Sequence, residues 1–117
     1  MVSNDKARTE WSGTQYQEVQ LNMKPMGNCL LEANKVINGE RQDTYGNPEN
    51  SFQIIAEYWT TFLKHKYGLR TPLTPLDATN MMVLFKQARK IGQKHKRDNY
   101  VDSCGYEAIG ADRLSEE

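Results

Sequence analysis

Apolar residues recur at helical spacing in four separate stretches of this chain. In each stretch they repeat every three or four residues, the period at which one face of an α-helix turns toward a core. The four stripes are Leu30, Ala33 and Ile37; Phe52, Ile55, Trp59 and Phe62; Met81, Leu84, Ala88 and Ile91; and Val101, Cys104, Ala108 and Ile109. No stretch alternates apolar and polar residues as a half-buried strand does. The pattern predicts an all-α fold, a compact bundle of about four helices.

Residues that favour helix termini bound the stripes. Asn, Thr or Asp precedes a start, Pro takes a first helical position, and Gly follows an end. The expected spans are about 28–39, 47–68, 74–92 and 98–114. The first helix ends at Gly39 or runs on to Arg41 or Asp43. The run Thr74-Pro75-Leu76-Asp77 has the pattern of a capping box, and Asp98 is expected to cap the fourth helix.

The chain divides into a polar N-terminal stretch and one helical domain. Its 117 residues suit a single core. Residues 1–25 show little periodicity and are interpreted as a flexible N-terminal arm, whereas residues 26–117 form the single helical domain. The alternative for the arm is a segment that docks on a neighbouring subunit through Trp11 and Tyr16.

Charge and composition exclude several classes of protein. Lys and Arg number 15, as do Asp and Glu, so the formal net charge is zero, which argues against a protein that coats long nucleic acid. No apolar run reaches the roughly 20 residues of a membrane span. Cys29 and Cys104 lie outside any paired metal motif and are expected to be reduced thiols rather than a disulfide. These features favour a cytoplasmic protein without a membrane partner.

The segment between the first two helices is the richest in polar chemistry. It reads Arg41-Gln42-Asp43-Thr44-Tyr45-Gly46-Asn47-Pro48 and places a cation, an amide, a carboxylate and a phenol within a few residues. A plain turn needs only the Gly-Asn-Pro end. The surplus indicates a ligand site, to which Arg41, Asp43 and Tyr45 are expected to contribute.

The third and fourth helices carry polar residues that would face this segment. Lys86 and Arg89 are three apart and point the same way, a spacing that suits a phosphate clamp. Asp98, Asp102 and Tyr106 share one face of the fourth helix, where two carboxylates a turn apart suit Mg²⁺. The alternatives are a solvated basic face for the first pair, and a helix cap and an ion pair for the carboxylates.

Gly105 lies in the middle of the fourth helix, where glycine costs roughly 1 kcal/mol relative to alanine. Such a residue usually has a packing reason. We expect it to let another helix or a ligand approach the backbone beside Tyr106.

Taken together, these residues resemble a known group of proteins. The motifs are Asn38-Gly39-Glu40-Arg41-Gln42-Asp43-Thr44-Tyr45-Gly46, Asn50-Ser51-Phe52, Thr74-Pro75, Met81-Met82-Val83-Leu84, Lys86 with Arg89, Asp98-Asn99-Tyr100-Val101-Asp102 and Gly105-Tyr106. Over about residues 28–112 the chain resembles a family of small phage and prophage proteins of uncharacterised function. More loosely, it is similar to phage proteins associated with nucleotide modification. That group is in turn similar to the all-α MazG-like nucleoside triphosphate pyrophosphohydrolases.

The looser resemblance implies a nucleotide-handling protein. Arg41, Lys86 and Arg89 would neutralise phosphates, Tyr45 or Tyr106 would stack on a base, and Asp98 and Asp102, with or without Asp43, would hold Mg²⁺. MazG-like enzymes hold their metal with an EXXE pair and an E/D-XX-D pair, and this chain has neither spacing. The expectation is therefore binding and sequestration of a nucleotide, or its Mg²⁺-dependent hydrolysis; no catalytic residue can be assigned.

A second interpretation is a non-catalytic structural or interaction protein. In that case the same charged residues form an internal salt-bridge network, which is common in folded proteins and implies no activity. Under either interpretation, the wide apolar stripe of the second helix predicts a homo-oligomer, a dimer or higher. If the protein binds a ligand, we expect the pocket to lie between subunits.

Overall fold

The computed structural model describes residues 25–39 and 46–114, which form one short 3-10 helix and four α-helices. In chain order these are η1 (Pro25–Gly27), α3 (Asn28–Asn38), α5 (Pro48–Tyr67), α6 (Pro75–Gly92) and α7 (Arg97–Arg113). This part of the chain contains no strand, so the all-α prediction is confirmed. The expected N-terminal arm and the predicted site residues Arg41, Asp43 and Tyr45 lie outside the described residues.

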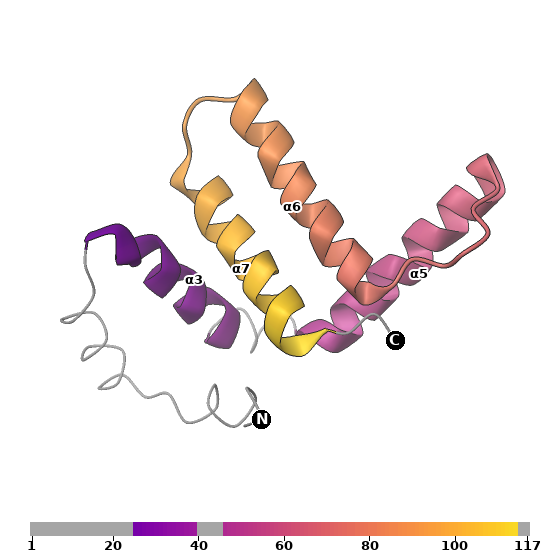
Figure 1. Cartoon of the computed structure of the whole chain (residues 1–117), viewed down its shortest axis with the longest axis horizontal. Coiled ribbons are helices and arrows are strands. Elements are labelled where there is room, and N and C mark those ends of the chain that lie inside the picture. Colours follow the sequence, from indigo (N-terminus) through magenta and orange to yellow (C-terminus); the bar gives the residue numbers. More distant parts are fainter. Residues whose placement is uncertain (1–24, 40–45, 115–117) are drawn as a thin grey trace.

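Helix α7 lies between two other helices (Figure 1). Helix α6 runs antiparallel along one side of it, and α3 packs along the other. Helix α5 crosses near the end of α7 and the start of α6, and its C-terminal half extends away from the other helices. The helices therefore form an open bundle from which the C-terminal half of α5 projects.

The helix ends follow local sequence chemistry closely. The Asn47 side chain accepts a hydrogen bond from the Asn50 backbone N–H at 3.0 Å, which caps α5, and Pro48 takes the first helical position. Gly68 ends α5 in the left-handed region at φ 71°, where glycine is favoured. Thr74 and Asp77 form the predicted capping box, each side chain accepting from the other's backbone N–H at 3.1 and 2.9 Å.

One cap differs from the prediction. Helix α7 begins at Arg97, its N-cap residue is Lys96, and no side chain caps it. Asp98 is therefore not the cap and lies inside the first turn instead. Its carboxylate still interacts favourably with the positive end of the helix dipole. Because an acidic residue suits both the N-cap and the first turn, the sequence did not distinguish the two positions.

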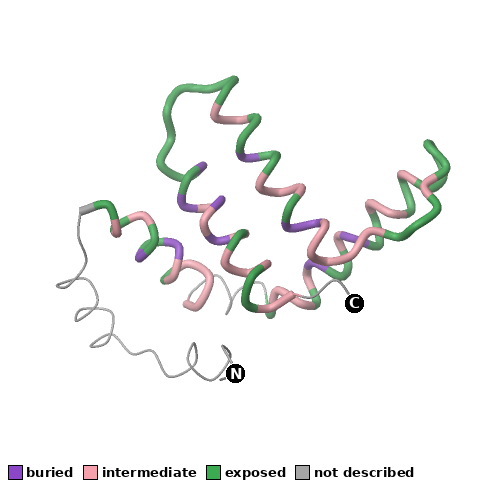
Figure 2. The backbone as a smooth tube through the Cα atoms, in the orientation of Figure 1, coloured by how far each residue is buried: buried purple, intermediate pink, exposed green. Residues whose placement is uncertain are grey.

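The hydrophobic core is small and lies where three helices meet. Phe52 and Ala56 from α5 and Ala78 from α6 are buried, and partly buried apolar residues from α5, α6, α7 and the adjoining chain surround them. Buried stretches, purple in Figure 2, also occur on α3 and along α7. The surrounding residues are Ile55, Trp59, Leu73, Met82, Tyr106, Ile109 and Leu114. The N-terminal half of α5 is thus held firmly. Among the described residues, no helix is long and apolar enough to cross a membrane.

Candidate functional site

A buried ion pair joins α6 to α7. The Lys86 ammonium lies 2.9 Å from Oδ2 of Asp102, and the two side chains are only 10% and 21% exposed. A lysine buried to this degree needs a negative partner, because desolvation disfavours an isolated ammonium. Two residues predicted to serve different ligands, phosphate for Lys86 and metal for Asp102, thus contact each other directly.

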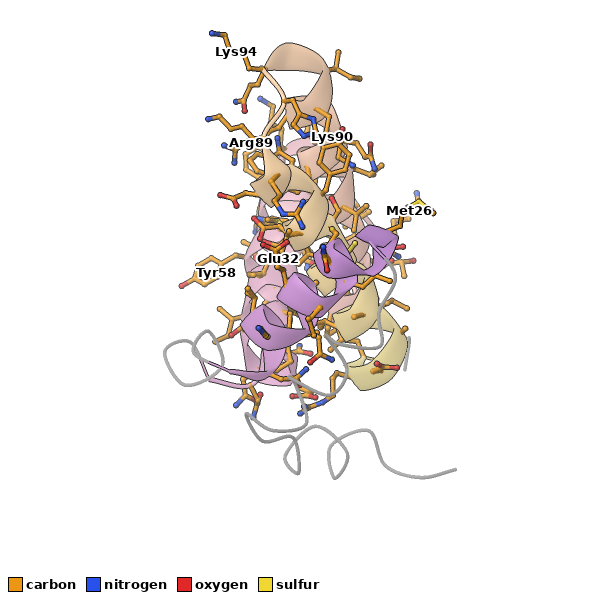
Figure 3. All side chains as sticks on the ribbon, turned by 90° about the vertical axis from the view of Figure 1, so that its left-hand side faces the viewer. Met26, Glu32, Tyr58, Arg89, Lys90 and Lys94 are labelled. Atoms are coloured by element: carbon orange, nitrogen blue, oxygen red, sulfur yellow. The ribbon has the colours of Figure 1, made fainter. Side chains whose placement is uncertain are left out.

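Arg89 and Asp98, two further predicted residues, are not part of that ion pair, although the Lys86 ammonium also lies over the Phe85 ring, 5.9 Å from its centre. The Arg89 guanidinium carbon lies 5.5 Å from the centre of the Phe85 ring, a cation–π contact. In Figure 3, Arg89, Lys90 and Lys94 lie toward the same end of the molecule. Asp98 is exposed in the first turn of α7. The described residues contain no group of three His, Cys, Asp or Glu side chains placed to hold a metal ion.

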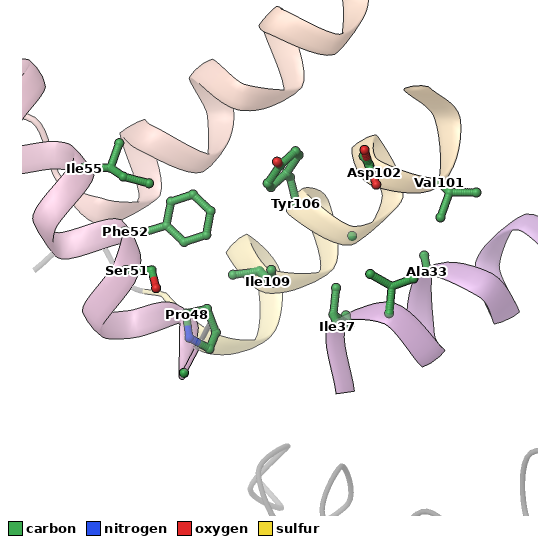
Figure 4. Close-up of a pocket in the computed structure, with 13 residues that line it drawn as sticks. Ala33, Ile37, Pro48, Ser51, Phe52, Ile55, Val101, Asp102, Tyr106 and Ile109 are labelled. Atoms are coloured by element: carbon green, nitrogen blue, oxygen red, sulfur yellow. The ribbon is translucent and has the colours of Figure 1, made fainter. Parts of the chain in front are cut away.

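A cavity of about 240 Å³ opens between α3, α5 and α7 (Figure 4). Most of its wall is apolar. The lining residues are Ala33, Val36, Ile37, Gly46, Pro48, Ser51, Phe52, Ile55, Val101, Asp102, Gly105, Tyr106 and Ile109. The cavity therefore brings Asp102 and Tyr106 together with residues predicted only as core.

The aromatic and charged parts of the wall lie one helical turn apart on α7. The Tyr106 ring meets Phe52 edge to face, with centroids 6.1 Å apart and planes at 88°. Asp102, one turn before Tyr106, connects the wall to the buried Lys86. Gly46, the first described residue after the Arg41–Tyr45 segment, also lines the cavity.

Gly105 explains how α3 comes close enough to form a wall. A Cβ atom at this position would lie 3.1 Å from Cγ2 of Ile37, closer than ordinary van der Waals contact. The absence of a side chain lets α3 pack against the backbone of α7 beside Tyr106. This confirms the packing reason inferred from the sequence.

Two polar contacts fasten α3 to α7. The Sγ atoms of Cys29 and Cys104 are 3.8 Å apart, and both cysteines are free thiols. Burial raises the pKa of the Cys104 thiol, with a further contribution from its hydrogen bond to Cys29. At the rim, the Arg97 Nε–H donates to Oε2 of Glu32 at 2.6 Å, and this bond lowers the pKa of the Glu32 carboxyl and raises that of Arg97.

The sequence indicated the polar members of this site more readily than its walls. Asp102 and Tyr106 line the cavity and Lys86 pairs with Asp102, while Arg89 and Asp98 are not among the lining residues. The apolar wall residues, such as Val36 and Ile109, were missed because an apolar side chain on a helix stripe looks the same whether it faces a core or a cavity. The one available signal was Gly105, which marked the close approach.

These features define a small all-α domain with an apolar cavity bordered by a buried ion pair. Residues 28–114 match the sequence model of the family described as "Domain of unknown function (DUF6378)", and the chain belongs to this family. It is 34% identical over 88 residues to the "Gene 55 protein" of Mycobacterium phage D29, covering 75% of this chain and 54% of that protein. It is also 34% identical over 80 residues to the "Gene 55 protein" of Mycobacterium phage L5, covering 68% and 48%.

The comparisons confirm the expected resemblance to a phage family. This chain spans about half the length of the curated relatives it matches. No solved structure matches it. The similarity to MazG-like pyrophosphohydrolases remains a prediction from the sequence motifs.

Proposed function

We propose that this phage-family protein binds a phosphorylated nucleotide, with the base in the cavity between α3, α5 and α7. The observation that carries the proposal is the composition of the cavity wall: aromatic and aliphatic side chains with one carboxylate among them. Small-molecule sites typically combine an apolar body with a few polar groups that fix orientation. A nucleobase has matching chemistry, a flat apolar face with N–H donors on its edge.

Two wall residues have clear roles in this proposal. Tyr106, already edge to face with Phe52, offers an aromatic surface for the base. Asp102 accepts a hydrogen bond from a ring or exocyclic N–H, because a carboxylate has about four acceptor sites and its ion pair with Lys86 holds it in place. At about 240 Å³ the cavity is slightly below the roughly 300–1,000 Å³ of sites for whole ligands, so the phosphates lie outside it.

The phosphates are assigned to the Arg41–Tyr45 segment on the basis of its sequence. Arg41 is the cation nearest in sequence to Gly46, which lines the cavity. Lys86 and Arg89 were expected to share this role, but Lys86 is paired with Asp102, and Arg89 contacts Phe85. Mg²⁺ fits the described residues poorly because a lysine ammonium lies beside Asp102 and Asp98 is exposed. We therefore propose binding and assign no hydrolytic step.

Thermal unfolding with a nucleotide panel tests this function. The panel spans mono-, di- and triphosphates of each base and cyclic dinucleotides, each with and without Mg²⁺. A bound ligand at 100 times its Kd stabilises the folded state by about 2.7 kcal/mol. For a domain of this size, this raises Tm by roughly 10 °C or more. A flat response across the panel would contradict the proposal.

Matched variants locate the site. Val36→Trp fills the cavity and Arg41→Ala removes the proposed phosphate cation, so both are expected to lose the response while still unfolding cooperatively. Arg70→Ala removes the same charge from an exposed loop residue and is expected to respond like the parent. A response that survives Val36→Trp would place the ligand elsewhere.

The Lys86–Asp102 pair also favours a second candidate, a structural or interaction protein in which the charges serve the fold. Its two partners are largely buried, as an internal network requires. This candidate predicts no nucleotide response and a large loss of stability when Lys86 is replaced. The panel therefore separates the two functions, whereas stability alone would not.

A further inference from the structure

Helix α5 has a second apolar stripe that the rest of the described chain leaves uncovered. Its first stripe, including Phe52 and Ala56, faces the core. On the opposite side, Ile54 and Tyr58 are 52% and 74% exposed, and Phe62, which is 59% exposed, lies at the edge of this stripe nearest the core-facing side. Figure 3 shows Tyr58 extending outward from the ribbon. A helix that is apolar on two sides normally buries both.

The uncovered stripe is large for a surface that stays in water. With aromatic side chains of about 150–250 Å² each, the three residues expose on the order of 400 Å². That is about half of the roughly 800 Å² that each partner contributes to a stable interface. Neighbouring residues on the projecting half of α5 can supply the remainder, since that half extends away from the other helices (Figure 1).

Charge along α5 identifies the partner. Its exposed residues Ile54, Tyr58, Thr61 and His65 are spaced four, three and four apart, as in the seam of a coiled coil. Glu57 and Lys64 each come one residue before a seam position, so both lie on the same flank, seven residues apart. One flank of the helix is thus acidic at one end and basic at the other, which makes it complementary to itself when reversed.

We propose that this stripe is the interface with a second copy of the chain, in which the two α5 helices pack antiparallel. Equivalent flanks face each other in an antiparallel pair, and centring the pair on Tyr58 and Thr61 places Glu57 of one copy opposite Lys64 of the other. The two-fold axis makes this ion pair twice. A parallel pair would place Glu57 beside Phe62 of the second copy, so the charges favour the antiparallel arrangement. This interface is independent of the proposed nucleotide function.

Charge reversal tests both the interface and its direction. The full chain is expected to have about twice the monomer mass of 13.5 kDa by sedimentation equilibrium. Glu57→Lys and Lys64→Glu each put like charges together twice, so each is expected to weaken the dimer roughly tenfold. The double variant restores opposite charges and is expected to restore the parent affinity. Glu107→Lys, the same reversal at an exposed position on α7, is the control and is expected to leave the mass unchanged.

A second pair of variants tests the seam at Tyr58. Tyr58→Arg is expected to give a folded monomer, while Ile91→Arg, at the 89% exposed Ile91 of α6, is expected to leave the dimer intact. A parent chain of monomer mass would overturn the proposal. So would a dimer unaffected by Tyr58→Arg, and single reversals not rescued by their combination would overturn the antiparallel arrangement.

Discussion

The joint between α3 and α7 and the projecting half of α5 use apolar side chains in opposite ways. At the joint, Gly105 removes a side chain so that Ile37 can approach the backbone, and the contact is close. Along α5, Tyr58 and Phe62 are large, and 74% and 59% of their surfaces are exposed. The first region depends on a missing side chain, and the second presents side chains that the described chain does not cover.

This difference separates two functions of the fold. The joint creates the cavity, because α3 can form a wall only where Gly105 lets it lie close to α7. The projecting half of α5 contributes nothing to that cavity, whose α5 residues all precede Ala56. The cavity proposed to bind a ligand and the surface proposed for self-association therefore lie on different parts of the molecule. Substitutions at the joint and at the neighbouring Lys86–Asp102 pair test that separation.

The largest expected effect comes from breaking the ion pair that borders the cavity. Lys86→Met removes the ammonium that lies 2.9 Å from the largely buried Asp102 carboxylate, and is expected to lower the free energy of unfolding by about 3 kcal/mol. Urea denaturation measures this. The mass of the assembly in sedimentation equilibrium should not change, because the pair lies away from the exposed stripe of α5.

Two further variants qualify that result. Lys86→Met with Asp102→Leu removes both charges and is expected to recover most of the stability. Lys94→Met, at an exposed position on the loop after α6, is expected to change stability by less than about 0.5 kcal/mol. Equal effects at Lys86 and Lys94 would mean that water screens the Lys86–Asp102 pair and that the region is not closed.

The sequence predicted the local structure of this region better than its long-range pairing. Caps at Asn47, Gly68 and Thr74 were predicted because each depends on hydrogen bonds or backbone angles within about five residues. The Lys86–Asp102 contact depends on how α6 lies against α7, and the periodicity of one helix does not carry that information.

The same limit explains the prediction of an oligomer with the pocket between subunits. The width of the apolar stripe on α5 was visible in the sequence, and exposed Tyr58 and Phe62 agree with an uncovered surface. Which side of α5 faces the cavity depends on packing. Phe52 and Ile55 line the cavity, whereas Ile54 and Tyr58 of the uncovered stripe lie on the other side of the helix. A pocket shared between subunits stays a prediction.

A smaller effect is expected from adding one methyl group at each of two helical glycines. Gly92→Ala meets no atom within 4 Å and is expected to raise the free energy of unfolding by up to about 1 kcal/mol through helix propensity. Gly105→Ala meets Ile37 at 3.1 Å, so its net effect is expected to be about 1–2 kcal/mol less favourable than that of Gly92→Ala.

A double-mutant cycle assigns that difference to the joint. In the background of Ile37→Ala, the contacting methyl group is gone, and Gly105→Ala is expected to become as favourable as Gly92→Ala. Urea denaturation of the four chains in the cycle gives the coupling energy. Additive effects of the two substitutions would show that α3 does not pack on the α7 backbone at Gly105.

The smallest effect is expected at the rim of the joint, where Arg97 donates to Glu32. The pKa of Glu32 in the folded protein lies below its model-compound value of 4.5, chiefly because of this hydrogen bond. The carboxylate therefore favours folding fully above that value, and the contribution is lost as the pH falls through the lower pKa of the folded state.

Solvent screens an exposed pair, so Arg97→Gln is expected to leave Tm at neutral pH almost unchanged. NMR titration should nevertheless show the Glu32 pKa rising toward its ordinary value in Arg97→Gln. An unchanged Glu32 titration would mean that Arg97 does not hold α3 against the start of α7. The contrast between the closely packed α3–α7 joint and the projecting half of α5 would then not extend to the rim of the joint.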